Sequence, residues 1–381
     1  MTRARVALSG IVALLLVWTL LIAWARWEVG EVPGDYLCFD RAASRFLAGE
    51  PLYVREWDHF DSPPYFVWLT LPAHALGTIG GDALATIAGL LLSALALVLV
   101  RRSIAPTPSP EAMLAAALYV PLWLSAAIGQ WGGAFFAVMA GGLFFATRRR
   151  PLEAGLVLSL LLAKPPLAIF VLPIVAIGLG RRAIAGIAIG TLLWALLSLP
   201  LGAHVWSEWL DQIAWAQTPQ AIALHRWQHH TLLGSFRALG SLLSLAPGVV
   251  RLAWLVIAVP LGVAAVVAAS RLLRAGEVAA GVAIAVLATI ALGPYLRYYD
   301  SQIVLIPTLV LLSRPQRSKM AGGLALAYLL LASLDAAYFQ EQAQVPVEGI
   351  LATGWLVLAL RDALRSAPSR LQRTAIDPVV P

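Results

Sequence analysis

The stretch "VALSGIVALLLVWTLLIAWA", residues 6–25, decides the class of this protein. It contains no charged residue and is long enough for one α-helix to cross about 30 Å of bilayer hydrocarbon. The basic start "MTRAR" is typical of a signal peptide, but no small-x-small cleavage motif ends the apolar run, and Arg26 and Trp27 follow it directly. We therefore predict an uncleaved first transmembrane helix with its N-terminus in the cytoplasm.

The composition of the whole chain supports a membrane protein. Hydrophobic residues make up 60% of the chain and charged residues 12%, with a mean hydropathy of +0.81. Soluble domains are about 45–50% apolar and about 25% charged. The net charge of +7 is expected from arginines at cytoplasmic helix ends, so we predict a lipid bilayer and no nucleic acid as partner. A single cysteine, Cys38, excludes an internal disulfide and a cysteine-based metal cluster.

Apolar segments continue to the end of the chain, separated by short turns. They predict an all-α, polytopic membrane protein with about 11–13 transmembrane helices in a single domain, residues 1–365, followed by a disordered cytoplasmic tail, 366–381. The stretch 64–80 is apolar enough to cross the membrane. Counting it as a span, however, would place some basic clusters on the external side, so a crossing helix and a re-entrant segment both stay open. The predicted spans are 6–25, 83–100, 111–127, 131–147, 152–163, 165–180, 183–200, 250–270, 278–292, 301–313, 320–334 and 347–361.

Basic clusters orient these helices. Under the positive-inside rule the clusters lie in the cytoplasm, and they occur at 101–102, 148–150, 181–182, 271–274, 314–319 and 361–365. Four segments then face outside: 26–63, the turn at 129–130, 201–247 and the turn at 293–300. Residues 26–63 hold eight of the 20 acidic residues, so polar chemistry is expected on the external side. We predict surface-lying helices in these external loops.

The external segment 26–63 contains a candidate catalytic acid. Asp35 follows a Pro-Gly turn signal and begins a short amphipathic pattern that stops at Gly49. A surface-lying helix with Asp35 near its N-terminus is predicted. On residue type alone, helix capping explains Asp35 better than catalysis does.

Two further polar residues interrupt apolar surroundings. Lys164, in "LLLAKPPLAIF", carries a charge into a span that Pro165 and Pro166 break. It either extends to the membrane surface or binds an anion such as a lipid phosphate. Gln130, in the turn "GQWGG", either satisfies loop backbone groups or lines a cavity.

The external turns supply the remaining candidates. In "GPYLRYYD", residues 293–300, Arg297 and Asp300 form either a local ion pair or a phosphate-binding group beside the aromatic Tyr299. His229 and His230 precede a second amphipathic segment. Adjacent histidines lack the i, i+4 spacing of a helical zinc pair, so we predict no metal site.

The order of these motifs resembles glycosyltransferase family 87 of the GT-C fold class, which includes polyprenol-phosphate-mannose-dependent mannosyltransferases. The resemblance covers roughly residues 30–313 and rests on collinearity, because each motif is short. The motifs are "ASRFLAGEPLY" (43–53), "SPPY" (62–65), "GQWGG" (129–133), "RRRPLEAGLVLSLLLAKPPLAIFVLP" (148–173), "TLLGSFRALG" (231–240) and "GPYLRYYDSQIVLIP" (293–307).

This resemblance implies a membrane enzyme that transfers a hexose, with mannose the first expectation, from a polyprenyl-phosphate donor. It implies an external active site, a glycolipid or glycan acceptor, inversion at the sugar and no cofactor. The family pattern of an acid, an aromatic residue four positions later and a terminal tyrosine selects Asp35 as the base, with Asp40 the competing acid and Tyr53 closing the motif. The family's Gln and Lys motifs fall on Gln130 and Lys164.

One part of the family pattern is absent, and one alternative function remains. Some members carry a histidine in the last external turn, where this chain has Tyr298, Tyr299 and Asp300. A multi-pass transporter or lipid flippase would also contain broken helices and buried charges. A transporter of this kind is expected to consist of two related halves, each with a broken helix. The sequence has no convincing internal repeat. We therefore favour a multi-pass glycosyltransferase of the cell membrane.

Overall fold

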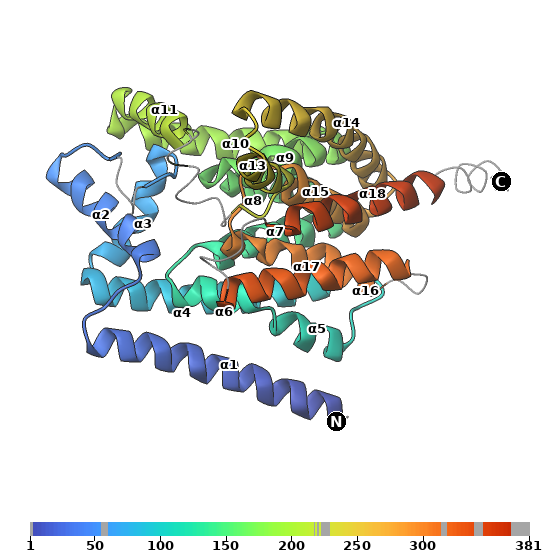
Figure 1. Ribbon diagram of the computed structural model, residues 1–381, viewed down its shortest axis with the longest axis horizontal. Coiled ribbons are helices and arrows are strands. Elements are labelled where there is room, and N and C mark those ends of the chain that lie inside the picture. The colour runs from blue at the N-terminus through green and yellow to red at the C-terminus, as the bar shows by residue number, and fades with distance from the viewer. Residues whose placement is uncertain are drawn as a thin grey trace.

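The computed structural model describes residues 3–54, 60–216, 218, 221, 229–313, 318–338 and 346–366, and this part of the chain is helical without a strand (Figure 1). The predicted all-α class is confirmed. The helices of the N-terminal half are α1 (Arg3–Glu28), α2 (Gly34–Ala48), η1 (Pro64–Phe66), α3 (Val67–His74), α4 (Gly77–Ser103), α5 (Pro110–Ala117), α6 (Val120–Ala127), α7 (Gly132–Thr147), α8 (Pro151–Leu158), η2 (Ser159–Ala163) and α9 (Pro165–Leu179). Those that follow are α10 (Arg181–Ser198), η3 (Leu199–Leu201), α11 (His204–Ala216), α13 (Leu232–Leu242), α14 (Pro247–Arg274), α15 (Val278–Leu292), η5 (Tyr298–Val304), α16 (Leu305–Leu312), α17 (Lys319–Tyr338) and α18 (Glu348–Ser366).

Every predicted span corresponds to a helix or to two consecutive helices. Among the described residues, four helices are long and apolar enough to cross a membrane, and the pair α5–α6, bent by 44°, makes up to five. The other apolar helices, such as α7, α9 and α15, have 10–17 residues. The protein is a polytopic membrane protein, while the expected number of 11–13 crossings remains a prediction.

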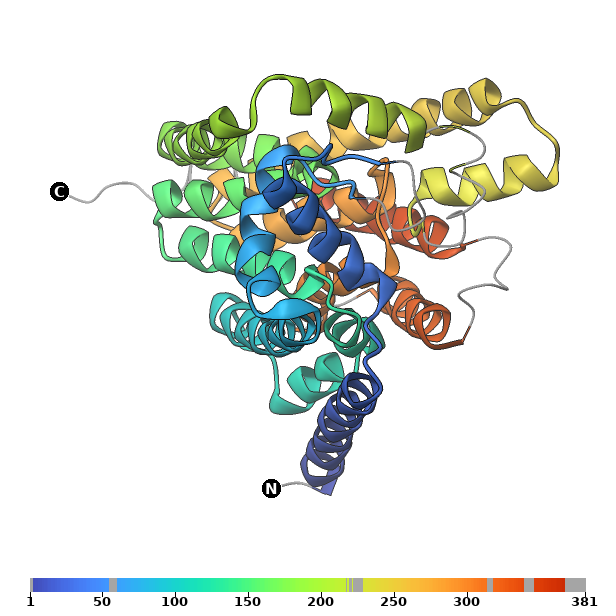
Figure 2. The same cartoon turned by 90° about the vertical axis from the view of Figure 1, so that its left-hand side faces the viewer.

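Exposure separates peripheral from central helices. On α1, the apolar side chains of Leu14, Trp18 and Trp24 are 57–69% exposed, and α1 stands apart at the bottom of Figure 2. By contrast, α15 is buried from Ala280 to Leu292. A helix that is apolar all round is buried in protein or faces lipid, so α15 lies in the core and α1 offers its surface to the bilayer.

Small residues allow the central helices to approach closely. A Cβ added at Gly133 on α7 would lie 2.4 Å from the carbonyl oxygen of Gly89 on α4. A Cβ at Gly186 on α10 would lie 2.0 Å from the carbonyl oxygen of Leu152 on α8. Such close backbone contact between small residues is a common means of packing helices within membranes.

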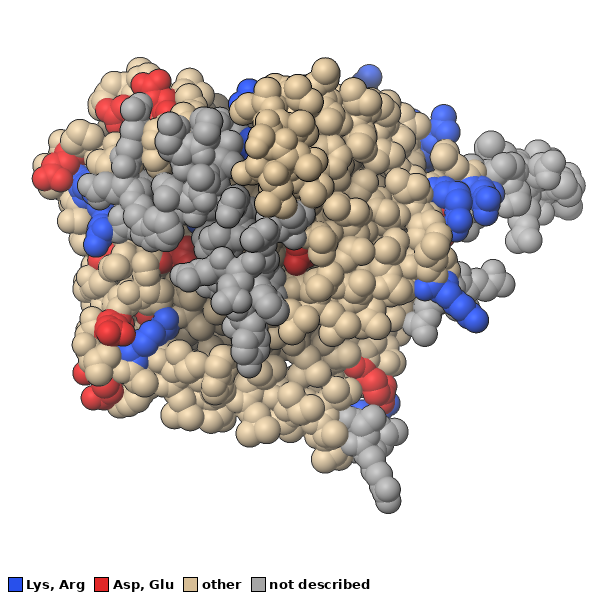
Figure 3. All heavy atoms as spheres, in the orientation of Figure 1, with Lys and Arg blue, Asp and Glu red and all other residues tan. Residues whose placement is uncertain are grey.

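The two ends of the bundle differ in charge. Basic residues end α4, α14 and α18, with Arg101 and Arg102, Arg271 and Arg274, and Arg365 in their last turns. Figure 3 shows blue side chains gathered at the end of the molecule near the C-terminus, whereas most red side chains lie at the end that carries α2 and α11. The predicted basic cluster at 314–319 is only partly described, because residues 314–317 lie outside the described residues.

The stretch 64–80 does not form a single span. It folds into η1 and the eight-residue α3, and α4 then begins at Gly77. Eight helical residues extend about 12 Å, which is less than half of the hydrocarbon thickness. Figure 2 shows α2 and α3 lying across the end of the bundle. The predicted tail after Ser366 lies outside the described residues.

Candidate active site

Asp35 lies in the first turn of α2, as predicted, but it does not cap the helix. The N-cap residue is Pro33, without a side-chain capping bond, and α2 ends at Gly49, which adopts φ 70°. The Asp35 carboxylate instead accepts a hydrogen bond of 2.9 Å from Nε2 of Gln130. The Asp35 side chain is therefore not used to cap α2. It connects the first turn of α2 to Gln130 in the turn before α7.

Gln130 reaches Asp35 because the turn before α7 is tightly enclosed. Gly129 adopts φ +69°, and a Cβ there would lie 2.7 Å from Cβ of Tyr36 and 2.9 Å from Oδ1 of Asp82. Gln130 itself is 7% exposed. Asp82 is fully buried and accepts a hydrogen bond of 2.8 Å from Nε1 of Trp27. The Gln130 amide also lies 3.5 Å from the carbonyl oxygen of Asp35, so its side chain contacts both the backbone and the carboxylate of Asp35, and a role in lining a cavity stays a prediction.

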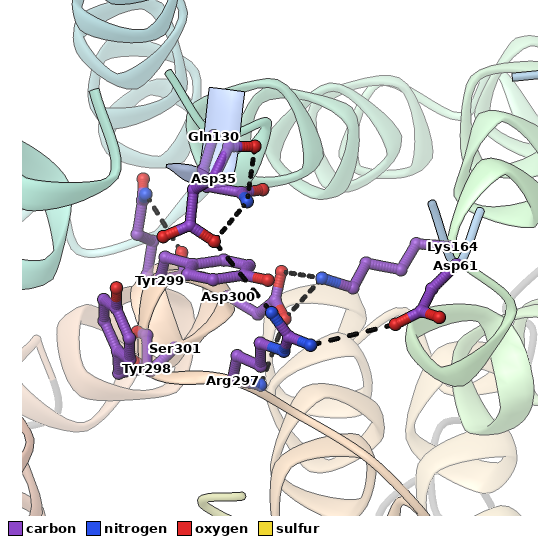
Figure 4. A network of polar contacts seen from close by, with 10 residues as sticks. Asp35, Asp61, Gln130, Lys164, Arg297, Tyr298, Tyr299, Asp300 and Ser301 are labelled. Carbon is purple, nitrogen blue, oxygen red and sulfur yellow. Dashed lines mark hydrogen bonds and ion pairs between the residues drawn. The ribbon is translucent and has the colours of Figure 1, made fainter. Parts of the chain in front are cut away.

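Arg297 lies between Asp35 and a second carboxylate. Its Nη1 atom is 3.9 Å from Oδ1 of Asp35, and its Nη2 atom is 3.7 Å from Oδ2 of Asp61 (Figure 4). The guanidinium carbon lies 5.4 Å from the ring centre of Tyr295 and 5.9 Å from that of Tyr299. These cation–π contacts hold the planar guanidinium while its donors face the carboxylates.

Lys164 forms an ion pair across the bundle. It separates η2 from α9 at the predicted Pro-Pro break, and its Nζ atom lies 2.7 Å from Oδ1 and 2.6 Å from Oδ2 of Asp300. The Asp300 side chain is fully buried and that of Lys164 is 19% exposed. The Lys164 ammonium group is thus paired with a buried carboxylate and does not extend to the surface, and anion binding by Lys164 stays a prediction.

Asp300 also organises the loop that carries Arg297. One of its carboxylate oxygens accepts a hydrogen bond of 3.1 Å from the backbone N–H of Arg297. Asp300 therefore contacts the backbone of Arg297, and not its side chain as the expected local ion pair would require. The Arg297 guanidinium extends toward Asp35 and Asp61 instead (Figure 4). Ser301 follows in η5 and shares a hydrogen bond of 2.7 Å with the hydroxyl of Tyr119.

The electrostatic environment suits Asp35 to accept a proton. Burial raises the pKa of Asp35 above its ordinary value, and Arg297 and the hydrogen bond from Gln130 partly oppose this rise. The side chains of Asp35 and Asp61 still keep 31% and 33% exposure. A carboxylate with a raised pKa is a stronger base when it is ionised, and the partly exposed Asp35 side chain can be reached by an acceptor.

Asp40 has a structural role on the same helix. Its carboxylate contacts Nδ1 of His74 at 2.7 Å and accepts a hydrogen bond of 2.8 Å from the hydroxyl of Thr78. These contacts join α2 to the end of α3 and the start of α4. Asp40 is therefore the less suitable of the two predicted acids.

The other predicted residues surround the site. Tyr53 donates a hydrogen bond of 2.7 Å to the carbonyl oxygen of Ser62 and so supports the segment that carries Asp61. His230 donates its backbone N–H to the carbonyl of Leu296 at 2.9 Å. The ring of His229 contacts that of Tyr295 edge to face, with 4.9 Å between ring centres. Both histidines thus lie against the Arg297 loop.

Sequence reasoning missed Asp61 and Tyr295. Asp61 stands directly before the quoted motif "SPPY", and Tyr295 lies within "GPYLRYYD". The only signal for Asp61 was an acid beside a Pro-Pro turn in a segment predicted to be external. The segment also contacts α11, since Nε1 of Trp209 donates a hydrogen bond of 3.0 Å to the Asp61 carbonyl oxygen.

The fold and site define a polytopic, all-helical membrane protein with a polar centre of acids and cations at one end of its helices. Over residues 60–294 the sequence matches glycosyltransferase family 87, and the chain belongs to this family. The protein is therefore a membrane glycosyltransferase, which disfavours the transporter alternative. The matched range includes Asp61, Gln130 and Lys164, whereas Asp35 and Arg297 lie outside it.

Two solved structures are similar to this chain. The apo crystal structure of ArnT from Cupriavidus metallidurans is 16% identical, with a TM-score of 0.40, over 93% of this chain and 77% of that one. The structure of the same protein bound to undecaprenyl phosphate is 15% identical, with a TM-score of 0.42, over 93% and 78%. No curated protein matches the sequence significantly.

Proposed function

We propose that this glycosyltransferase moves a hexose from a polyprenyl-phosphate donor to a glycan or glycolipid acceptor at the external face of the cell membrane, with inversion at the sugar carbon. The observation that carries the proposal is the contact of 3.9 Å between the Asp35 carboxylate and the Arg297 guanidinium. Transfer from a phosphate donor requires a base for the acceptor and a cation for the leaving group, and these two residues supply both within one site.

The proposed reaction is a single displacement. Asp35 accepts the proton of the acceptor hydroxyl as the acceptor oxygen forms a bond to the anomeric carbon. The bond from that carbon to the phosphate oxygen breaks, and its electron pair leaves with the polyprenyl phosphate. One base is sufficient, because no glycosyl-enzyme intermediate forms.

Arg297 is the proposed phosphate ligand. A guanidinium presents planar, paired donors that match a phosphate, and the side chain is already held by Tyr295 and Tyr299. Lys164 is bound closely to Asp300 and supports the loop that carries Arg297, because Asp300 also accepts the backbone N–H of Arg297. Gln130 orients the base. Asp40, Tyr53, His229 and His230 are assigned to the walls around the donor and acceptor.

The external side is inferred from charge. Arginines at the ends of α4, α14 and α18 mark the cytoplasmic end under the positive-inside rule. Asp35 and Arg297 belong to segments at the opposite ends of these helices. A lipid-linked sugar can be delivered to that side, whereas cytoplasmic nucleotide sugars do not cross the bilayer. A polyprenyl phosphate is therefore the donor class that agrees with this orientation.

The test uses the purified full chain in nanodiscs. Polyprenyl phosphates carrying mannose, glucose, galactose or N-acetylglucosamine, and separately GDP-mannose and UDP-glucose, are supplied with soluble oligosaccharide acceptors, and the glycosylated acceptor is quantified by mass spectrometry. We expect turnover with at least one lipid-linked hexose, mannose first, and none with GDP-mannose or UDP-glucose. Turnover with a nucleotide sugar alone would refute the donor class.

A further inference from the structure

The helix α11 lies above α2 and α3 at the end of the molecule that carries the candidate active site (Figures 1 and 2). Trp209 connects this helix to the site, because its Nε1 atom donates a hydrogen bond of 3.0 Å to the carbonyl oxygen of Asp61. The Asp61 carboxylate in turn lies 3.7 Å from Arg297. A continuous set of contacts therefore leads from the proposed reaction centre to α11.

Two polar side chains of α11 have unsatisfied atoms. Among the residues that the structure describes, Oε2 of Glu208 and Nε2 of Gln212 are buried and make no hydrogen bond. Gln212 is 2% exposed. The two residues are four positions apart, so they share one face of the helix. Buried polar atoms without partners are rare in folded proteins and require an explanation.

The surroundings place this face toward the site. The carboxylates of Asp61 and Glu208 both act on Tyr53, where burial first and these two negative charges next raise the pKa of the phenol. Tyr53 is the external residue whose hydroxyl supports Ser62, next to Asp61. Glu208 therefore lies on the side of α11 that faces Tyr53 and the Asp61 segment.

The geometry points to a subsite for the hydroxyl groups of a neutral glycan, formed by Glu208 and Gln212 beside Asp61. A sugar hydroxyl both donates and accepts, so it can donate to the Glu208 carboxylate while a neighbouring hydroxyl accepts from the Gln212 amide. A cationic ligand would satisfy Glu208 but leave the amide unpaired, and an anionic ligand would be repelled by Glu208 and Asp61. The assignment of this glycan as the acceptor rests on the proposed function.

The test measures glycan binding without requiring turnover. Saturation-transfer NMR on the full chain in nanodiscs uses mannotriose and maltotriose as probes and putrescine as the cationic comparison. The variants are Glu208→Gln and Gln212→Leu, with Asp211→Asn as the matched control, because Asp211 is exposed on the same helix. We expect binding of at least one glycan by the wild type and by Asp211→Asn, and about tenfold weaker binding by each subsite variant.

Other outcomes overturn the subsite. Absence of glycan binding by the wild type, equal binding by all variants, or a preference for putrescine would each contradict it. If water alone partners these two atoms, Gln212→Leu should unfold at a higher temperature without any glycan effect, since it removes an unpaired polar group. Undecaprenyl phosphate binding is measured in parallel. Its failure in the wild type would count against the proposed donor, whereas its retention in Glu208→Gln with loss of glycan binding would support the subsite.

Discussion

The Nη1 atom of Arg297 lies 3.9 Å from Oδ1 of Asp35, farther than a hydrogen bond of 2.7–3.2 Å. Arg297 keeps a comparable distance of 3.7 Å from Asp61. Lys164, in contrast, contacts both oxygens of Asp300 within 2.7 Å. The Arg297 guanidinium is thus close to two carboxylates without a hydrogen bond between the atoms measured. Turning its N–H donors toward a phosphate would therefore cost less free energy than freeing the Lys164 ammonium group from Asp300.

Replacing Arg297 should weaken donor binding. We expect Arg297→Gln to raise the dissociation constant for undecaprenyl phosphate by about 10–100-fold, because one charge-assisted contact contributes about 1.5–3 kcal/mol. Native mass spectrometry in nanodiscs measures this change. Arg41→Gln, on the exposed side of α2, serves as the control. Equal affinity in the Arg297 variant and the wild type would remove Arg297 from the phosphate site.

Breaking the Lys164–Asp300 pair should destabilise the fold. Lys164→Met leaves the fully buried Asp300 carboxylate unpaired, which should lower stability by about 3–5 kcal/mol. The double variant Lys164→Met/Asp300→Asn should recover most of this loss, because no charge then remains buried. Thermal unfolding in detergent compares the three proteins. A single variant as stable as the wild type would show that the pair contributes little.

Removing Gln130 should shift the pH dependence of transfer. The Gln130 hydrogen bond lowers the pKa of Asp35, against the rise caused by burial. Gln130→Leu should therefore raise this pKa further, and the acidic limb of the kcat profile should move to higher pH, since Asp35 must be ionised to accept a proton. The unfolded-state pKa of about 3.9 sets the lower reference. An acidic limb at unchanged or lower pH would contradict this role of Gln130.

Asp40→Asn should affect stability more than catalysis. It weakens the contacts to His74 and Thr78, so we expect a loss of about 1–3 kcal/mol in unfolding free energy. Its kcat should stay within a few-fold of the wild type when measured below the unfolding temperature. Loss of turnover in a stably folded Asp40→Asn protein would move the catalytic role toward this residue.

The helical architecture could be predicted because local sequence determines it. The apolar run after "MTRAR" formed α1, the Gly49 stop ended α2, and the Pro-Pro break after Lys164 separated η2 from α9. The stretch 64–80 could not be resolved, because hydropathy does not report a break at residues 75–76. The short α3 becomes clear only when its packing against α2 and α4 is known.

The candidate site was predicted in part. Asp35, Gln130, Lys164, Arg297 and Asp300 were each selected, and the structure brings them together (Figure 4). Their pairing could not be predicted, because Lys164 and Asp300 are 136 residues apart. Asp61 was missed for the same reason. Asp61 contacts Arg297 and accepts a hydrogen bond from Trp209, which is 148 residues later in the chain.

The central claim is that Asp35 is the base, and Asp35→Asn tests it most directly. Asparagine is nearly isosteric and its carbonyl can still accept the Gln130 hydrogen bond, but it cannot take up the acceptor proton. With a polyprenyl-phosphate hexose and acceptor in nanodiscs, the variant should fold, bind undecaprenyl phosphate as the wild type does, and lose about 10²–10⁴-fold in turnover. Turnover near the wild-type value would contradict the account.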